Sequence, residues 1–73
     1  MHKKDVEMQR KVSAIIKIKG TTWMAIAKDM GISNQYLRNV ANGLKPNQDK
    51  RNELARRLGY QNWSELSKER IIL

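Results

Sequence analysis

The apolar residues between Trp23 and Asn42 are spaced as no single uninterrupted helix would space them. Gly31 lies between two groups of them, and a glycine there lets the chain take a left-handed conformation at low steric cost. Ala27 offers the small residue that a steep crossing of two helices needs. The stretch therefore predicts two short helices joined by a tight turn, a helix-turn-helix over about residues 22–42, with inward positions at Ile26, Met30, Ile32, Leu37 and Val40.

Capping residues and helical spacing divide the rest of the chain into further short helices. We expect five helices in all, over about residues 5–18, 23–30, 34–42, 48–58 and 63–70, with no strand-like alternation between them. The expected N-caps are Asp5, Thr22 (or Thr21), Ser33, Asn47 and Asn62. The sequence thus predicts one compact all-α domain over residues 1–73, in which residues 1–4 form a flexible basic arm.

The first helix is predicted to be amphipathic. A basic amphipathic helix can lie on a membrane surface. Here the apolar stripe is narrow, and the helices predicted after it have apolar faces that another helix must cover. We therefore expect the stripe to pack against the core, with Lys11 and Lys17 turned outward; the stripe consists of Met8, Val12, Ile15 and Ile16.

The distribution of charge points to an anionic partner. Fifteen Lys and Arg residues against seven Asp and Glu residues leave a formal charge of +8. Between Met8 and Gln48 there are seven basic residues and one acidic residue, Asp29, so this segment alone carries +6. Basic residues gathered where acids are excluded are typical of nucleic-acid binding. A basic surface that is merely solvated is the alternative.

Several function classes find no support in the sequence. The chain has no cysteine and one histidine, His2, so we expect no metal site and no cofactor. There is no nucleophile beside a histidine, no carboxylate cluster and no phosphate-cradling glycine loop, which argues against an enzyme. The apolar runs are far shorter than the roughly 20 residues of a membrane-spanning helix, and no signal-peptide core follows the basic start. We expect a cytoplasmic protein.

The third predicted helix separates polar from apolar side chains. Asn34, Gln35, Arg38, Asn39 and Asn42 fall within one arc, at about 100° per residue. Asn and Gln suit the N6 and N7 atoms of adenine in the major groove, and Arg suits the O6 and N7 atoms of guanine. The arc therefore predicts an outward, base-reading face. The long side chain of Arg38 could instead reach a phosphate, and the opposite arc holds Tyr36, Leu37, Val40 and Ala41.

The segment from Gly20 to Ser33, GTTWMAIAKDMGIS, together with Leu37, Val40, Asn42-Gly43, Pro46 and the LARRLG run at 54–59, resembles the lambda-repressor/Cro-like, or XRE, helix-turn-helix family. The resemblance covers about residues 12–67. It implies a five-helix domain that binds double-stranded DNA, usually as a two-fold dimer, and a family with many phage, plasmid and mobile-element repressors. It also implies that the first residues of the third helix point deepest, so the expected base readers are Asn34, Gln35, Arg38 and Asn39.

The same resemblance implies two phosphate clamps. Thr22 and Trp23 would form the first, although many members have glutamine where this chain has Trp23, whose indole N–H could donate to a phosphate oxygen instead. Some members pair an arginine with a glutamate where this chain has Ile16 and Ala41, so that contact is expected to be apolar. Ser33 has a capping role and a possible DNA contact. The second clamp would comprise Asn42, Gly43, Leu44 and Lys45.

The leading hypothesis is a sequence-specific transcriptional regulator, a repressor that occupies an operator as a homodimer. A protein-interaction module, antitoxin-like or antirepressor-like, is the second hypothesis, and a sequence-blind nucleic-acid binder is the third. The apolar residues near the C-terminus would either cover the core or pair with another chain; they are Trp63, Leu66, Ile71, Ile72 and Leu73.

Overall fold

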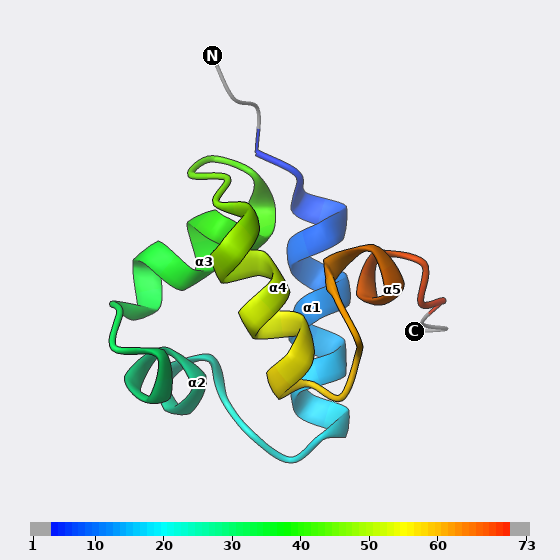
Figure 1. Cartoon of the computed structure of the whole chain (residues 1–73), viewed down its shortest axis with the longest axis horizontal. Coiled ribbons are helices and arrows are strands. Elements are labelled where there is room, and N and C mark those ends of the chain that lie inside the picture. Colours follow the sequence, from blue (N-terminus) through cyan, green and yellow to red (C-terminus); the bar gives the residue numbers. More distant parts are fainter. Residues whose placement is uncertain (1–3, 71–73) are drawn as a thin grey trace.

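The computed structural model describes residues 4–70, and within that range it contains five α-helices and no strand (Figure 1). The predicted all-α architecture is therefore confirmed. The basic arm predicted for residues 1–4 lies outside the described residues except for Lys4, and His2 also lies outside them. The helices are α1 (Val6–Ile18), α2 (Trp23–Met30), α3 (Asn34–Asn42), α4 (Gln48–Arg57) and α5 (Trp63–Ser67).

Each helix begins where the sequence predicts a cap. In every case the side-chain oxygen of the cap accepts the backbone N–H three residues further on, at 2.9–3.2 Å. Thr22, and not Thr21, caps α2. At the other end of α2, Gly31 adopts φ 72°, a left-handed conformation that an L side chain would strain. These local signals fix the starts of the helices and the bend between α2 and α3.

The prediction for the end of the last helix was wrong, because α5 ends at Ser67 and not near Arg70. The amides of Lys68 and Glu69 donate to carbonyls three residues back, at 3.3 and 3.0 Å, which tightens the final turn. The Ser67 hydroxyl also donates to the Ser64 carbonyl at 2.8 Å. Serine competes in this way for carbonyls that a continuing helix would use.

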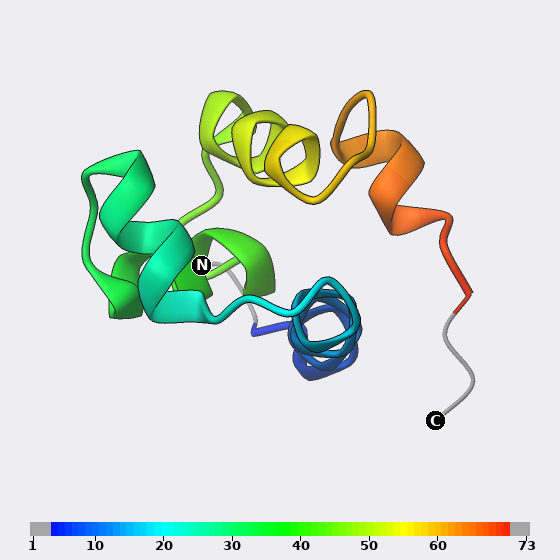
Figure 2. The ribbon, with the colours of Figure 1, turned by 90° about the horizontal axis from the view of Figure 1, so that it is seen from below.

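The core lies in the space that the five helices enclose. In Figure 2, α1 is seen end-on with α4 opposite it, while α2 and α3 close one end and α5 closes the other. Ile16 and Ala41 both belong to the core cluster. This agrees with the expectation that the contact at these two positions is apolar. Trp63 and Leu66 are 7% and 0% exposed, so these two residues cover the core and are not free for pairing. Ile71, Ile72 and Leu73 lie outside the described residues.

One expectation for α1 needs correction. Lys11 does not turn outward: it is half-buried, and its Nζ donates to the Ser67 carbonyl at 2.7 Å, joining α1 to α5. A lysine beside an apolar stripe can bury its stem in this way while its ammonium reaches an acceptor.

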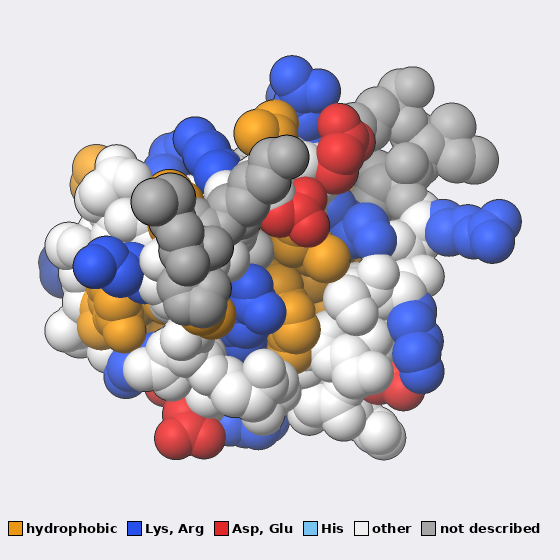
Figure 3. Space-filling model, turned by 90° about the horizontal axis from the view of Figure 1, so that it is seen from above, with side chains coloured by type: hydrophobic (Ala, Val, Ile, Leu, Met, Phe, Trp, Pro, Cys, Tyr) orange, Lys and Arg blue, Asp and Glu red, His pale blue; other side chains and the backbone are white. Residues whose placement is uncertain are grey.

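Met8 is half-buried at the edge of the core cluster. Seen from above, hydrophobic side chains show in the middle of the face, with charged side chains around them (Figure 3).

Candidate nucleic-acid interface

The polar arc predicted for α3 is present, but it has four members and not five. Gln35 is exposed, and Asn34, Arg38 and Asn39 are half-buried. Asn42 is wrongly predicted, because its side chain is only 1% exposed. The four side chains follow directly after the turn at Gly31.

Two hydrogen bonds order the polar side chains of α3 in pairs. The Nε2 atom of Gln35 donates to Oδ1 of Asn39 at 3.0 Å. The Nε atom of Arg38 donates to Oδ1 of Asn34 at 2.9 Å. Each pair spans one helical turn, where side chains four residues apart are neighbours. The first pair leaves Oε1 of Gln35, an acceptor, and Nδ2 of Asn39, a donor, outside that bond.

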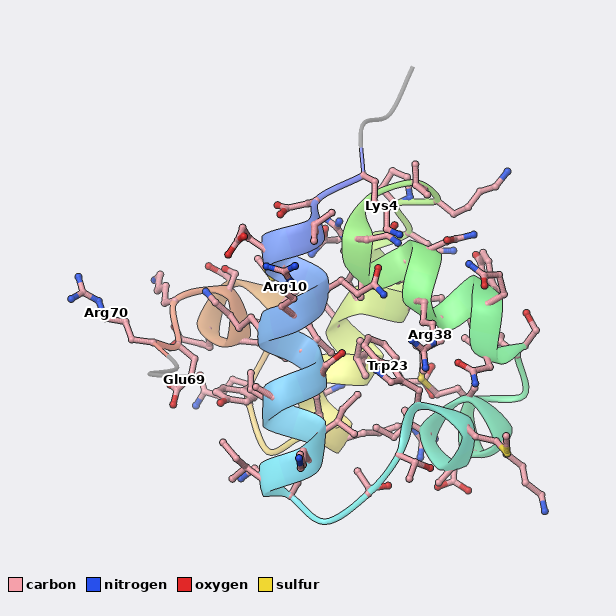
Figure 4. All side chains as sticks on the ribbon, turned by 180° about the vertical axis from the view of Figure 1, so that it is seen from behind. Lys4, Arg10, Trp23, Arg38, Glu69 and Arg70 are labelled. Atoms are coloured by element: carbon pink, nitrogen blue, oxygen red, sulfur yellow. The ribbon has the colours of Figure 1, made fainter. Side chains whose placement is uncertain are left out.

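Trp23 occupies the junction of α1, α2 and α3. Its ring is 7% exposed, and its Nε1 donates to the Ser13 hydroxyl of α1 at 3.0 Å. The expectation that the indole N–H is directed to a phosphate is therefore not met, because this donor is used within the protein. The Arg38 Cζ lies 5.2 Å from the centroid of the Trp23 ring, and in Figure 4 the two side chains point toward one another. This distance is within the range of a cation–π contact.

An open hollow of about 490 Å³ lies beside this stack. Its walls come from the C-terminal half of α1, the start of α2 and the start of α3. Thr22 belongs to it, with its hydroxyl oxygen accepting from the Ala25 amide at 3.0 Å. Among the described residues, those that line the hollow include no acid. They are Ser13, Ile16, Lys17, Thr21, Thr22, Trp23, Met24, Asn34 and Arg38.

The segment after α3 differs from the expected second clamp. Oδ1 of Asn42 accepts the Leu44 amide at 3.0 Å, and its Nδ2 donates to Gln9 Oε1 at 2.9 Å. The side chain of Asn42 and the amide of Leu44 are thus used within the protein. Gly43 takes φ 87° as the C-cap of α3. Lys45 has an exposed side chain, although its backbone N–H donates to the Asn39 carbonyl at 3.1 Å.

Ser33 and the charged residues of the basic segment remain to be placed. Ser33 is exposed, and its hydroxyl accepts the Tyr36 amide at 3.0 Å, so its capping role is confirmed. Asp29, the acid of the basic segment, lies 4.0 Å from the guanidinium of Arg57. Its charge is thereby partly offset. Lys17, Lys19 and Lys28 are exposed.

Two α1 residues that hold the surface in place, Ser13 and Gln9, were not predicted; they bind the side chains of Trp23 and Asn42. Ser13 lies one turn before Ile16, beside the buried stripe of α1, and a polar residue at such a position signals a partner on the neighbouring helix. Gln9 lies one turn before Val12 and Ser13 and carries a similar signal. Neither signal identifies which side chain is held.

Comparison of the chain with protein-family models, curated proteins and solved structures returned no match. Within residues 4–70, no cluster of His, Cys, Asp and Glu side chains is arranged to hold a metal ion. None of the described helices has the length and hydropathy needed to cross a lipid bilayer.

Proposed function

We propose that the protein is a sequence-specific double-stranded DNA-binding regulator of the lambda-repressor/Cro-like type, in which α2 and α3 form the helix-turn-helix. One observation carries the proposal: a row of amide and guanidinium side chains on α3 follows directly after the left-handed turn at Gly31. A helix of this kind lies in the major groove with its first residues against base edges.

The Gln35–Asn39 pair is the best candidate for reading a base pair directly. Its hydrogen bond leaves one acceptor, Gln35 Oε1, and one donor, Asn39 Nδ2, for other partners. Adenine presents the complementary set in the major groove, a donor at N6 and an acceptor at N7. The pairing supports readout of an A·T base pair by this turn of α3.

The surrounding charge supports contact with the DNA backbone. Lys17 and Thr22 lie on the α2 side of the candidate surface, and Lys45 lies beyond the C-terminus of α3. Contacts on both sides of a recognition helix fix its register on the duplex without carrying sequence information. One helix-turn-helix reads few base pairs, so we propose two copies on half-sites about 34 Å apart. Bound at an operator, such a dimer would repress by occupying the site.

The rival protein-interaction hypothesis would use Trp23, Tyr36 and the C-terminal apolar residues against another protein. Against the part played by Trp23, its ring is buried and its N–H donates to Ser13. The sequence-blind alternative depends on charge alone and makes a different experimental prediction.

Selection from random duplex DNA, followed by titration of the selected duplex and a scrambled duplex at two salt concentrations, tests the proposal. Specific recognition predicts a preference of about 10³-fold or more for the selected sequence. Gln35→Ala should reduce that preference at one base pair by about 10- to 100-fold while leaving binding to scrambled DNA nearly unchanged. If the selection enriches no DNA sequence, the proposal is overturned. If the protein then still binds duplex DNA, with an affinity that falls steeply as salt rises, a sequence-blind binder is supported.

A further inference from the structure

We propose that Arg38 contacts a phosphodiester group of the DNA backbone and does not read a base, and that Trp23 is the positioning residue that holds it there. This inference deepens the proposed function and rests on it. It divides the polar row of α3 into a base-reading pair, Gln35 and Asn39, and a backbone-contacting pair, Asn34 and Arg38.

Arg38 is restrained from two directions. Its Nε donates to Asn34 Oδ1 at 2.9 Å, and its Cζ lies over the Trp23 ring at 5.2 Å from the centroid. Trp23 is in turn fixed, because it is 7% exposed and bound to Ser13 of α1 at 3.0 Å. The guanidinium is thus held on the side of α3 that faces α2 and α1, where Figure 4 shows it pointing at Trp23.

This position suits a phosphate better than a base edge. The side-on bidentate contact with guanine uses Nε together with one Nη, and here Nε is already donating to Asn34. Leaving the Trp23 ring to reach the groove would also break the stacking contact. The terminal Nη groups remain for an acceptor that approaches from the hollow.

The lining of the hollow matches a phosphodiester. It combines the cations Lys17 and Arg38 with hydroxyl groups of Thr21 and Thr22, and the described residues that line it include no acid. The hollow is open to solvent, so a group that belongs to a long chain can enter it. Arg binds phosphate oxygens with a planar set of donors, which the stack on Trp23 would hold ready before DNA arrives.

The first test compares Arg38→Ala with Gln35→Ala on the selected and the scrambled duplex. Arg38→Ala should weaken binding to both by the same factor, about 10-fold, and lower the slope of log affinity against log salt by about 0.9 per chain. Selection with this variant should return the wild-type sequence. Arg70→Ala, which removes the same charge on the far side of α1 from Arg38 (Figure 4), is the matched control and should change the slope less. Loss of preference at one base pair, with an unchanged slope, would overturn the inference.

The second test concerns Trp23. Trp23→Leu removes the ring under the guanidinium, whereas Trp23→Phe keeps a ring without the hydrogen bond to Ser13. In folded protein, checked by circular dichroism, we expect Trp23→Leu to reproduce the loss caused by Arg38→Ala, and Arg38→Ala to add little to it. Trp23→Phe should retain most of the affinity. The positioning role of Trp23 would be contradicted if Trp23→Phe bound DNA as weakly as Arg38→Ala. It would also be contradicted if folded Trp23→Leu kept the wild-type slope of log affinity against log salt.

The outcomes separate the two proposals. A wild-type chain that enriches no sequence yet binds scrambled duplex would overturn sequence-specific recognition, while the loss of salt slope in Arg38→Ala would still support the backbone contact. If the wild type enriches a sequence and Arg38→Ala loses preference at one base pair, sequence-specific recognition is supported and the backbone contact of Arg38 is overturned. A wild-type chain that binds no duplex would overturn both.

Discussion

The side-chain amide of Asn42 donates to Oε1 of Gln9 at 2.9 Å, joining the last turn of α3 to the first turns of α1. The carbonyl of the same residue accepts the Asp5 amide at 2.7 Å, and its Oδ1 accepts the Leu44 amide. Asn42 is 1% exposed, so its own polar atoms are shielded from water. It therefore fixes how the end of α3 meets the start of α1.

Asn42→Ala should destabilise the protein by about 1–3 kcal/mol, because the Leu44 amide and Gln9 Oε1 lose their partner. For a domain of this size that corresponds to a fall of several degrees in Tm, measured by circular dichroism. Gln61→Ala, on an exposed side chain, is the control and should leave Tm nearly unchanged. Equal Tm values for the two variants would contradict a structural role for Asn42.

Ser13→Ala should cost about 1 kcal/mol of unfolding free energy, since it leaves the Trp23 N–H without its acceptor. The same variant should shift the NMR resonance of the Trp23 indole proton. The second tryptophan, Trp63, is the internal control, and its indole resonance should stay in place. A shift of neither resonance would show that the hydrogen bond is absent in solution.

Ser33→Ala should lower stability by about 1 kcal/mol through loss of the α3 cap. Ser33→Asp keeps an oxygen that can cap, so its stability should remain close to that of the wild type. If Ser33 also lies near a phosphate, the aspartate should weaken DNA binding in a stable protein. Unfolding in denaturant and DNA titration measure the two effects separately.

Tyr60 should titrate above its ordinary pKa of 10.0, because desolvation by burial, and then the charge of Glu69, raise the pKa of the phenol. A raised pKa in the folded state means that the stability it contributes is complete below pH 10 and is lost as the pH rises through the folded value. Tyr36→Phe leaves Tyr60 as the one tyrosine for spectrophotometric titration. Adding Glu69→Gln should lower the apparent pKa, and an unchanged value would exclude Glu69 as a cause.

Lys45→Ala should weaken binding to selected and scrambled duplexes alike and lower the salt slope by about 0.9 per chain. Its side chain is exposed beyond the end of α3, where a backbone contact is proposed. Lys68→Ala, next to α5 at the opposite end of the fold from α2 and α3, is the control for net charge (Figure 1). A similar loss for both variants would mean that Lys45 acts only through the overall field.

The local parts of this fold were predictable from the sequence. Helix starts depend on one side chain and one amide three residues away, which is why the caps at Thr22, Ser33 and Asn62 were predicted correctly. The turn at Gly31 has an equally local cause.

Contacts between helices were less predictable. A helical wheel placed Asn42 with the exposed residues because it represents α3 alone, whereas burial comes from α1 crossing the end of that helix. The same limit applies to Trp23 and Lys11. The Trp23 indole donates to Ser13 of α1, and the Lys11 ammonium donates to the carbonyl of Ser67 in α5. Each partner lies on another helix, and the spacing of residues along one helix cannot identify it.

The hydrogen bond between Gln35 and Asn39 stays within one turn of α3 and involves no other helix. Changing an exposed side chain such as Gln35 usually alters stability by no more than about 0.5 kcal/mol. If these residues read bases, mutation can alter the preferred DNA sequence without threatening the fold. Descendants of this protein could then diverge in their target sites one substitution at a time, while the core and caps stay as they are.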